Sequence, residues 1–135
     1  MKMSRLSALA LCAMLTACAT ARDGVSGKFH RFDATEYAQT VDILKTVRGI
    51  EPQCSNFAHA QRMIDTVSDQ LDHLVLYSEA RPYNQRMVSL ALDVRKLIID
   101  TQARNTMSEL FCQERARNLV RAAETLRSTS GAKPE

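Results

Sequence analysis

Residues 57–78, FAHAQRMIDTVSDQLDHLVLYS, decide the fold of this chain. Apolar or small side chains recur along them at alternating spacings of three and four, at Phe57, Ala60, Ile64, Val67, Leu71, Leu74 and Ser78. That spacing places them on one face of an α-helix. A seam of this kind packs against neighbouring helices at shallow angles. We therefore predict a bundle helix that begins near Pro52 or Ser55 and ends near Glu79, ahead of Arg81-Pro82.

A shorter helix is predicted before it. Asp33 and Glu36 have the spacing of a capping box, and Phe32 and Tyr37 that of a hydrophobic staple around it. Gly49 is expected to end this helix. Its predicted apolar stripe consists of Tyr37, Val41, Leu44 and Val47.

The third predicted helix covers residues 84–104 and is apolar over more than one stripe. One side carries Met87, Leu90, Ala91, Val94, Leu97 and Ile98. The flanking residues are Val88, Leu92 and Ile99. Such a helix is either the most central one or leaves a strip free for a partner, so these three flanking residues are the candidate partner surface.

A fourth helix is predicted from a second capping box, Thr106 with Glu109. One face of it carries Cys112, Ala116, Leu119, Ala123 and Leu126. We expect residues 129–135 to form a disordered tail. The predicted fold is thus all-α, a small up-down four-helix bundle over residues 33–128. It has three helices if the last two form one kinked rod through Asn105.

Composition agrees with one helical domain. The chain has 135 residues, 45% of them hydrophobic and 24% charged, and its four Gly and three Pro are too few for a turn-rich β-sandwich. The net charge of +3 includes Lys2 and Arg5, which lie in a 17-residue start without acids. The remainder is close to neutral with interspersed signs, so we expect no nucleic-acid partner.

The first 17 residues have the three parts of an export signal. A basic start precedes the ten-residue apolar run LSALALCAML at positions 6–15, and two small residues follow, Thr16 and Ala17. A transmembrane helix would need about 20 apolar residues. We therefore predict a cleaved signal peptide over residues 1–17.

The stretch Leu15-Thr16-Ala17-Cys18 resembles the lipobox of bacterial lipoproteins. The resemblance implies cleavage before Cys18, a diacylglyceryl group on its thiol, and further acyl chains such as palmitate that hold the protein on a membrane. Ala19 after the cysteine implies the outer membrane, facing the periplasm. Residues 18–32 would then be the lipidated cysteine and a flexible tether. The alternative is an ordinary signal cut near Ala17 or Ala21, with Cys18 incidental.

Cys54 and Cys112 then remain as the only cysteine pair, and an exported pair is normally oxidised. The second and fourth helices of an up-down bundle run parallel, so both residues are expected at the same end of the bundle. We predict a structural disulfide. A redox or metal role is disfavoured because the chain has no Cys-x-x-Cys motif and no His near either cysteine at ligand spacing.

The sequence contains no complete set of metal ligands and no catalytic motif. His59 with Met63, and Asp69 with His73, each lie four residues apart, but neither pair finds a third ligand, so we expect no metal or haem. No Gly-x-Ser-x-Gly motif or paired acids suggest an enzyme. The last predicted helix carries Arg115, Arg117, Arg121 and Arg127, with Glu114 and Glu124 among them. We interpret it as a salt-bridged face with Glu114–Arg117 and Glu124–Arg121 pairs rather than an anion or lipid-headgroup site.

In outline, the lipobox, Cys54 early in the domain and a second cysteine opening the last helix in CQERARNLV, residues 112–120, are similar to the helical pilotins of type II secretion. These lipoproteins escort secretin subunits to the outer membrane. The resemblance implies an accessory or assembly factor of the cell envelope that binds another protein. The alternatives are a structural or stress lipoprotein that binds peptidoglycan or lipid, and a small-ligand carrier or enzyme. We expect no cofactor.

Overall fold

The computed structural model describes residues 32–131. Four α-helices follow one another, α2 (Ala34–Arg48), α3 (Phe57–Glu79), α4 (Gln85–Gln102) and α5 (Glu109–Gly131). A short 3-10 helix, η1 (Glu51–Gln53), lies between α2 and α3. The predicted signal peptide, Cys18 and the segment up to residue 31 lie outside the described residues.

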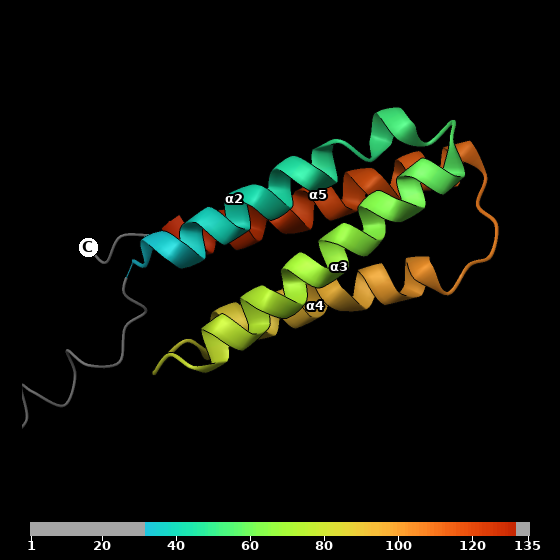
Figure 1. The fold of residues 1–135 in the computed structure, drawn as a ribbon. Coiled ribbons are helices and arrows are strands. Elements are labelled where there is room, and N and C mark those ends of the chain that lie inside the picture. The colour runs from blue at the N-terminus through green and yellow to red at the C-terminus, as the bar shows by residue number, and fades with distance from the viewer. Residues whose placement is uncertain (1–31, 132–135) are drawn as a thin grey trace, which may run out of the picture. The chain divides into compact units, whose positions relative to one another are not determined.

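Successive helices run antiparallel, so the domain is an up-down four-helix bundle, as predicted (Figure 1). Helix α2 packs against α3 and α5, and α4 packs against the same two helices. The α4–α5 pair has the least extensive contact of these four. Each helix therefore has two neighbours and keeps one outer face towards solvent.

The core follows the predicted seam of α3. Ala60, Ile64, Val67, Leu71, Leu74 and Ser78 are all buried there, whereas Phe57 is half-buried. The predicted face of α5 is also confirmed, with all five of its members buried. Fully burying a side chain such as Leu71 contributes roughly 1.5–3 kcal/mol, so these two faces supply much of the driving force for folding.

The stripe predicted for α2 is confirmed at Leu44 and Val47 and wrong at Tyr37 and Val41. Its buried residues are Glu36, Thr40, Ile43, Leu44 and Val47. Tyr37 and Val41, which apolar spacing alone favoured, are only half-buried. The helix is rotated about its axis because Glu36 and Thr40 find hydrogen-bond partners inside the bundle.

Gly49 caps α2 with a right-handed φ of −76°, so its role is not the left-handed turn that commonly ends helices. A Cβ added there would lie 2.6 Å from Met63 Cε. The glycine therefore lets Met63 of α3 approach the end of α2.

The beginning of α3 differs from the prediction. Asn56 is the cap, and its Oδ1 accepts from the His59 N–H at 3.2 Å. Pro52 instead lies within η1. The chain needs this extra turn because it carries Cys54, which is buried against α5, before α3 begins.

Helices α4 and α5 are separate, as predicted, and do not form one kinked rod. Two predictions about the end of the domain are wrong, namely the cap of α5 and the start of the tail. Ser108 rather than Thr106 caps α5, its Oγ accepting from the Phe111 N–H at 3.3 Å. The chain between α4 and α5 is used to pack Met107 against the core, which moves the helix start by two residues. Helix α5 then continues past residue 128, because Ser130 is fully buried and its Oγ lies 2.9 Å from Thr40 Oγ.

Candidate protein-binding surface

The predicted partner surface lies on the side of α4 that borders α3. Leu92 and Ile99 are 43% and 49% exposed, and Val88 is half-buried. The core positions of the helix are taken by Met87, Ala91, Val94 and Ile98. The bundle therefore leaves two large apolar side chains uncovered, and burial within the domain does not account for them. We call Val88, Leu92 and Ile99 the α4 strip.

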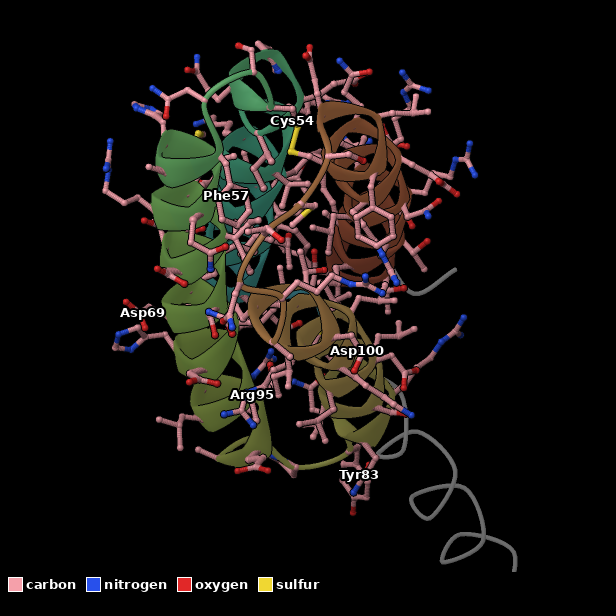
Figure 2. The ribbon with its side chains drawn as sticks, turned by 90° about the vertical axis from the view of Figure 1, so that its right-hand side faces the viewer. Cys54, Phe57, Asp69, Tyr83, Arg95 and Asp100 are labelled. Atoms are coloured by element: carbon pink, nitrogen blue, oxygen red, sulfur yellow. A yellow bond between two sulfur atoms is a disulfide. The ribbon has the colours of Figure 1, made fainter. Side chains whose placement is uncertain are left out.

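Polar pairs fix how α3 and α4 are aligned. Arg95 Nε lies 2.6 Å from Asp72 Oδ1, and Gln102 Nε2 donates to Asp65 Oδ1 at 2.8 Å. Figure 2 shows Arg95 where α3 and α4 meet. In antiparallel helices these pairs place Leu76 of α3 at about the level of Leu92. Leu76 is 66% exposed, so α3 extends the apolar surface. The periodic pattern did not indicate Leu76, because this residue lies outside the seam.

A cavity of about 340 Å³ opens at one end of this surface. The α3–α4 turn and the first half of α4 form its walls. Its lining includes two members of the α4 strip, Val88 and Leu92, and polar side chains from the end of α3 and the start of α4. These are Ser78, Glu79, Arg81, Asn84, Gln85 and Ser89. The surface thus combines an apolar strip with a pocket that also has polar side chains in its lining.

A buried carboxylate organises the polar side of this pocket. Glu36 of α2 has no exposed surface, and its Oε2 accepts from Ser78 Oγ at 3.0 Å and from Arg81 Nη1 at 3.2 Å. Asn84 Nδ2 donates to the same oxygen. We call these four residues the carboxylate cluster. It joins the N-terminus of α2 to the α3–α4 turn, and a buried charge is tolerated there because it has a cation and several donors.

The capping box predicted at α2 is therefore half right. Asp33 Oδ1 accepts from the Glu36 N–H at 2.8 Å, as a cap should. The Glu36 side chain, however, is committed to Ser78, Arg81 and Asn84 rather than to the backbone of Asp33. Asn84 is drawn into the same cluster and makes no side-chain cap for α4.

The pKa of Asp33 is lower than its ordinary value. The hydrogen bond from the Glu36 backbone N–H is the main cause that lowers the pKa of Asp33 below 3.8, with burial opposing it. The Tyr77 hydroxyl and the Arg81 guanidinium lower it further. Tyr77 Oη donates to Asp33 Oδ1 at 3.1 Å, and Arg81 Nη2 lies 3.7 Å from Oδ2. Asp33 therefore caps α2 and ties it to the end of α3.

The α3–α4 turn contains Tyr83, whose φ is +60°. Left-handed backbone costs a non-glycine residue roughly 1–2 kcal/mol. Tyr83 is nevertheless 51% exposed. Its side chain lies at the end of the bundle opposite Cys54 (Figure 2). We call this the turn end, and the opposite end the disulfide end.

The disulfide end carries the predicted Cys54–Cys112 bond, which is present. The two Cα atoms lie 5.6 Å apart, and 58 positions separate the residues in sequence. Both cysteines are buried, at 4% and 2% exposure. The bond joins the connection between α2 and α3 to the beginning of α5. This is the position expected if α3 and α5 run parallel.

The other residues singled out in the sequence do not assemble into a site. Met63 packs against the core, and His59 Nδ1 lies 3.3 Å from an Arg62 nitrogen. Within residues 32–131 no group of three His, Cys, Asp or Glu side chains could hold a metal ion. No helix in that range is long and apolar enough to cross a membrane.

Two charged residues of α5, Arg117 and Glu124, pair with residues outside α5. Arg48 of α2 reaches Glu124 at 2.9 Å, and Arg117 reaches Glu51 at 2.8 Å. The predicted pairs Glu114–Arg117 and Glu124–Arg121 are therefore wrong, because partners across the helix junctions are within reach. Arg115 instead lies 5.0 Å from the Phe111 ring centroid.

Comparison of the chain with protein-family models, curated proteins and solved structures found no match.

Proposed function

We propose that this chain is a lipid-anchored lipoprotein of the bacterial cell envelope, held on the outer membrane through Cys18 and facing the periplasm. Its bundle serves as an accessory or assembly factor that binds another envelope protein. The chain acts by binding, without catalysis or a cofactor. Similarity to the helical pilotins adds the proposal that the partner is a subunit of an outer-membrane machine.

One observation carries the binding role, namely the exposure of Leu92 and Ile99 on a helix whose core positions are already filled. Leu76 of α3 is exposed at about the level of Leu92, and Leu92 lines a cavity. Large exposed apolar side chains beside a pocket with polar groups are a common feature of protein-binding sites. An apolar strip along a helix also offers contacts at spacings that a partner helix or extended segment can match.

Site-specific photocrosslinking in the producing cells tests this role. A photoreactive residue is placed at position 92 or 99 of the full chain, and a matched control is placed at Ala38, an exposed position on α2. We expect one membrane or periplasmic protein to crosslink in excess from positions 92 and 99 and not from position 38. Equal crosslinking from all three positions would contradict the proposal.

Surface variants sharpen the test. Leu92→Lys and Ile99→Lys are expected to abolish that crosslink from a neighbouring position while leaving the unfolding midpoint nearly unchanged, since both residues face solvent. Retention of the protein on purified cell wall, without any protein crosslink, would favour the peptidoglycan-binding alternative instead.

A further inference from the structure

Two aromatic side chains are exposed at the turn end of the bundle, where the segment from Cys18 enters the domain. Phe32 is 45% exposed and Tyr83 is 51% exposed. They belong to the same end because Asp33, next to Phe32, pairs with Arg81, two residues before Tyr83. Figure 2 places Tyr83 at the end opposite Cys54.

The backbone of the turn holds Tyr83 outwards. Its φ of +60° is a conformation that tyrosine rarely adopts. The polar residues of the turn, Arg81 and Asn84, point inwards and donate hydrogen bonds to Glu36. Phe32 lies just before α2, and its ring centroid is 5.9 Å from that of Tyr37. Tyrosine favours the boundary between lipid headgroups and acyl chains, and phenylalanine is common among the residues that interfacial segments bury there.

We propose that the turn end docks against the bilayer that carries the lipid on Cys18, with Tyr83 and Phe32 in the headgroup region. This inference rests on the lipid attachment in the proposed function. Residues 19–31 span at most about 45 Å when fully extended, so the turn end cannot be far from the membrane. Linkers of this length give effective concentrations in the millimolar range, so two aromatic contacts of modest affinity suffice for docking.

The docked arrangement sets the direction of the bundle. Helix α3 has 23 residues and is about 35 Å long, so the disulfide end stands about that far above the headgroups. The α4 strip then faces sideways, parallel to the membrane surface, where another membrane-attached protein can reach it. Arg86 in the first turn of α4 is exposed near the same end, which suits phosphate-bearing headgroups.

The chain contains no tryptophan, so a single introduced one reports on its own surroundings. We compare Tyr83→Trp with the control Leu110→Trp, whose site is 74% exposed on α5 towards the disulfide end. Both are made in the full acylated chain and placed in vesicles of phosphatidylethanolamine and phosphatidylglycerol, with or without bromine near the top of the acyl chains. Brominated lipid is expected to lower the emission at position 83 by roughly half or more, and to leave position 110 unchanged.

Adding Phe32→Ser to Tyr83→Trp is expected to weaken the quenching, because it removes the second exposed aromatic ring at the turn end. Protein that sediments with the vesicles but shows equal emission in both lipids would overturn the docking while leaving the anchor intact. Protein that fails to sediment would overturn the anchor and the docking together. Quenching at positions 83 and 110 alike would also overturn an end-on arrangement.

Discussion

The two ends of the bundle are closed by different chemistry. At the disulfide end, one covalent bond joins Cys54 to Cys112 across 58 positions of sequence. At the turn end, the Glu36 carboxylate gathers donors from α3 and from the turn up to 48 positions away. The covalent link depends on an oxidising compartment, whereas the carboxylate cluster depends on the hydrogen bonds that Glu36 Oε2 accepts in a buried site. Breaking each end separately shows how much of the stability each one carries.

The largest effect is expected at the disulfide end. Replacing both Cys54 and Cys112 by Ala should lower the free energy of unfolding by about 4 kcal/mol, since the bond closes a 58-residue loop in the unfolded chain. Urea unfolding monitored by circular dichroism measures this. Reductant should produce a similar loss in the natural chain and none in the double variant. An unchanged midpoint under reductant would show that the bond is not a stabilising one.

The next largest effect is expected at the turn end. Glu36→Ala leaves the donors of Ser78, Arg81 and Asn84 without their shared acceptor, and we expect a loss of about 3 kcal/mol. Thr35→Ala, at the exposed neighbouring position, is the control and should change stability by less than about 0.5 kcal/mol. Equal losses in the two variants would mean that the cluster contributes little.

A smaller effect of opposite sign is expected from the turn itself. Tyr83→Gly removes the cost of a left-handed φ from a side chain that is half exposed, so we expect stability to rise by up to about 1 kcal/mol. Thermal unfolding of the two proteins measures this. Tyr83→Ala, which keeps a Cβ and thus the strain, should show no such gain.

The smallest effect concerns pH. The pKa of Asp33 is lower in the folded chain than its ordinary value of 3.8, so the folded state binds its proton less readily than the unfolded state. Its contribution is therefore complete above that value and is lost as the pH falls through the folded pKa. Asp33→Asn keeps a capping side chain without the charge. Between neutral and acidic pH its urea midpoint should fall less than that of the natural chain, and equal falls would exclude a role for this charge.

The same comparison shows what sequence could predict. The disulfide end was predictable because only two cysteines remain after Cys18, and periodicity assigned them to helices that run in the same direction. The seam of α3 and the face of α5 were predictable because aliphatic side chains at regular spacing have one place to go, the core.

The turn end was not predictable in the same way. Glu36 is polar, and local pattern assigned it to a capping box, whereas Asn84 was expected only as the start of a helix. Their burial depends on α2 and the α3–α4 turn meeting in space, which no local spacing encodes. Leu76 was missed for a related reason, because its exposure becomes visible only once the seam of α3 is aligned against α4.

Export is the claim on which both the disulfide and the proposed anchor depend, and the intact mass of the protein purified from cell membranes tests it most directly. We predict a chain that begins at Cys18, carries acyl groups there, and has two hydrogens fewer than the reduced form because Cys54 and Cys112 are joined. A chain that begins at Met1, without lipid and with free thiols, would contradict the account.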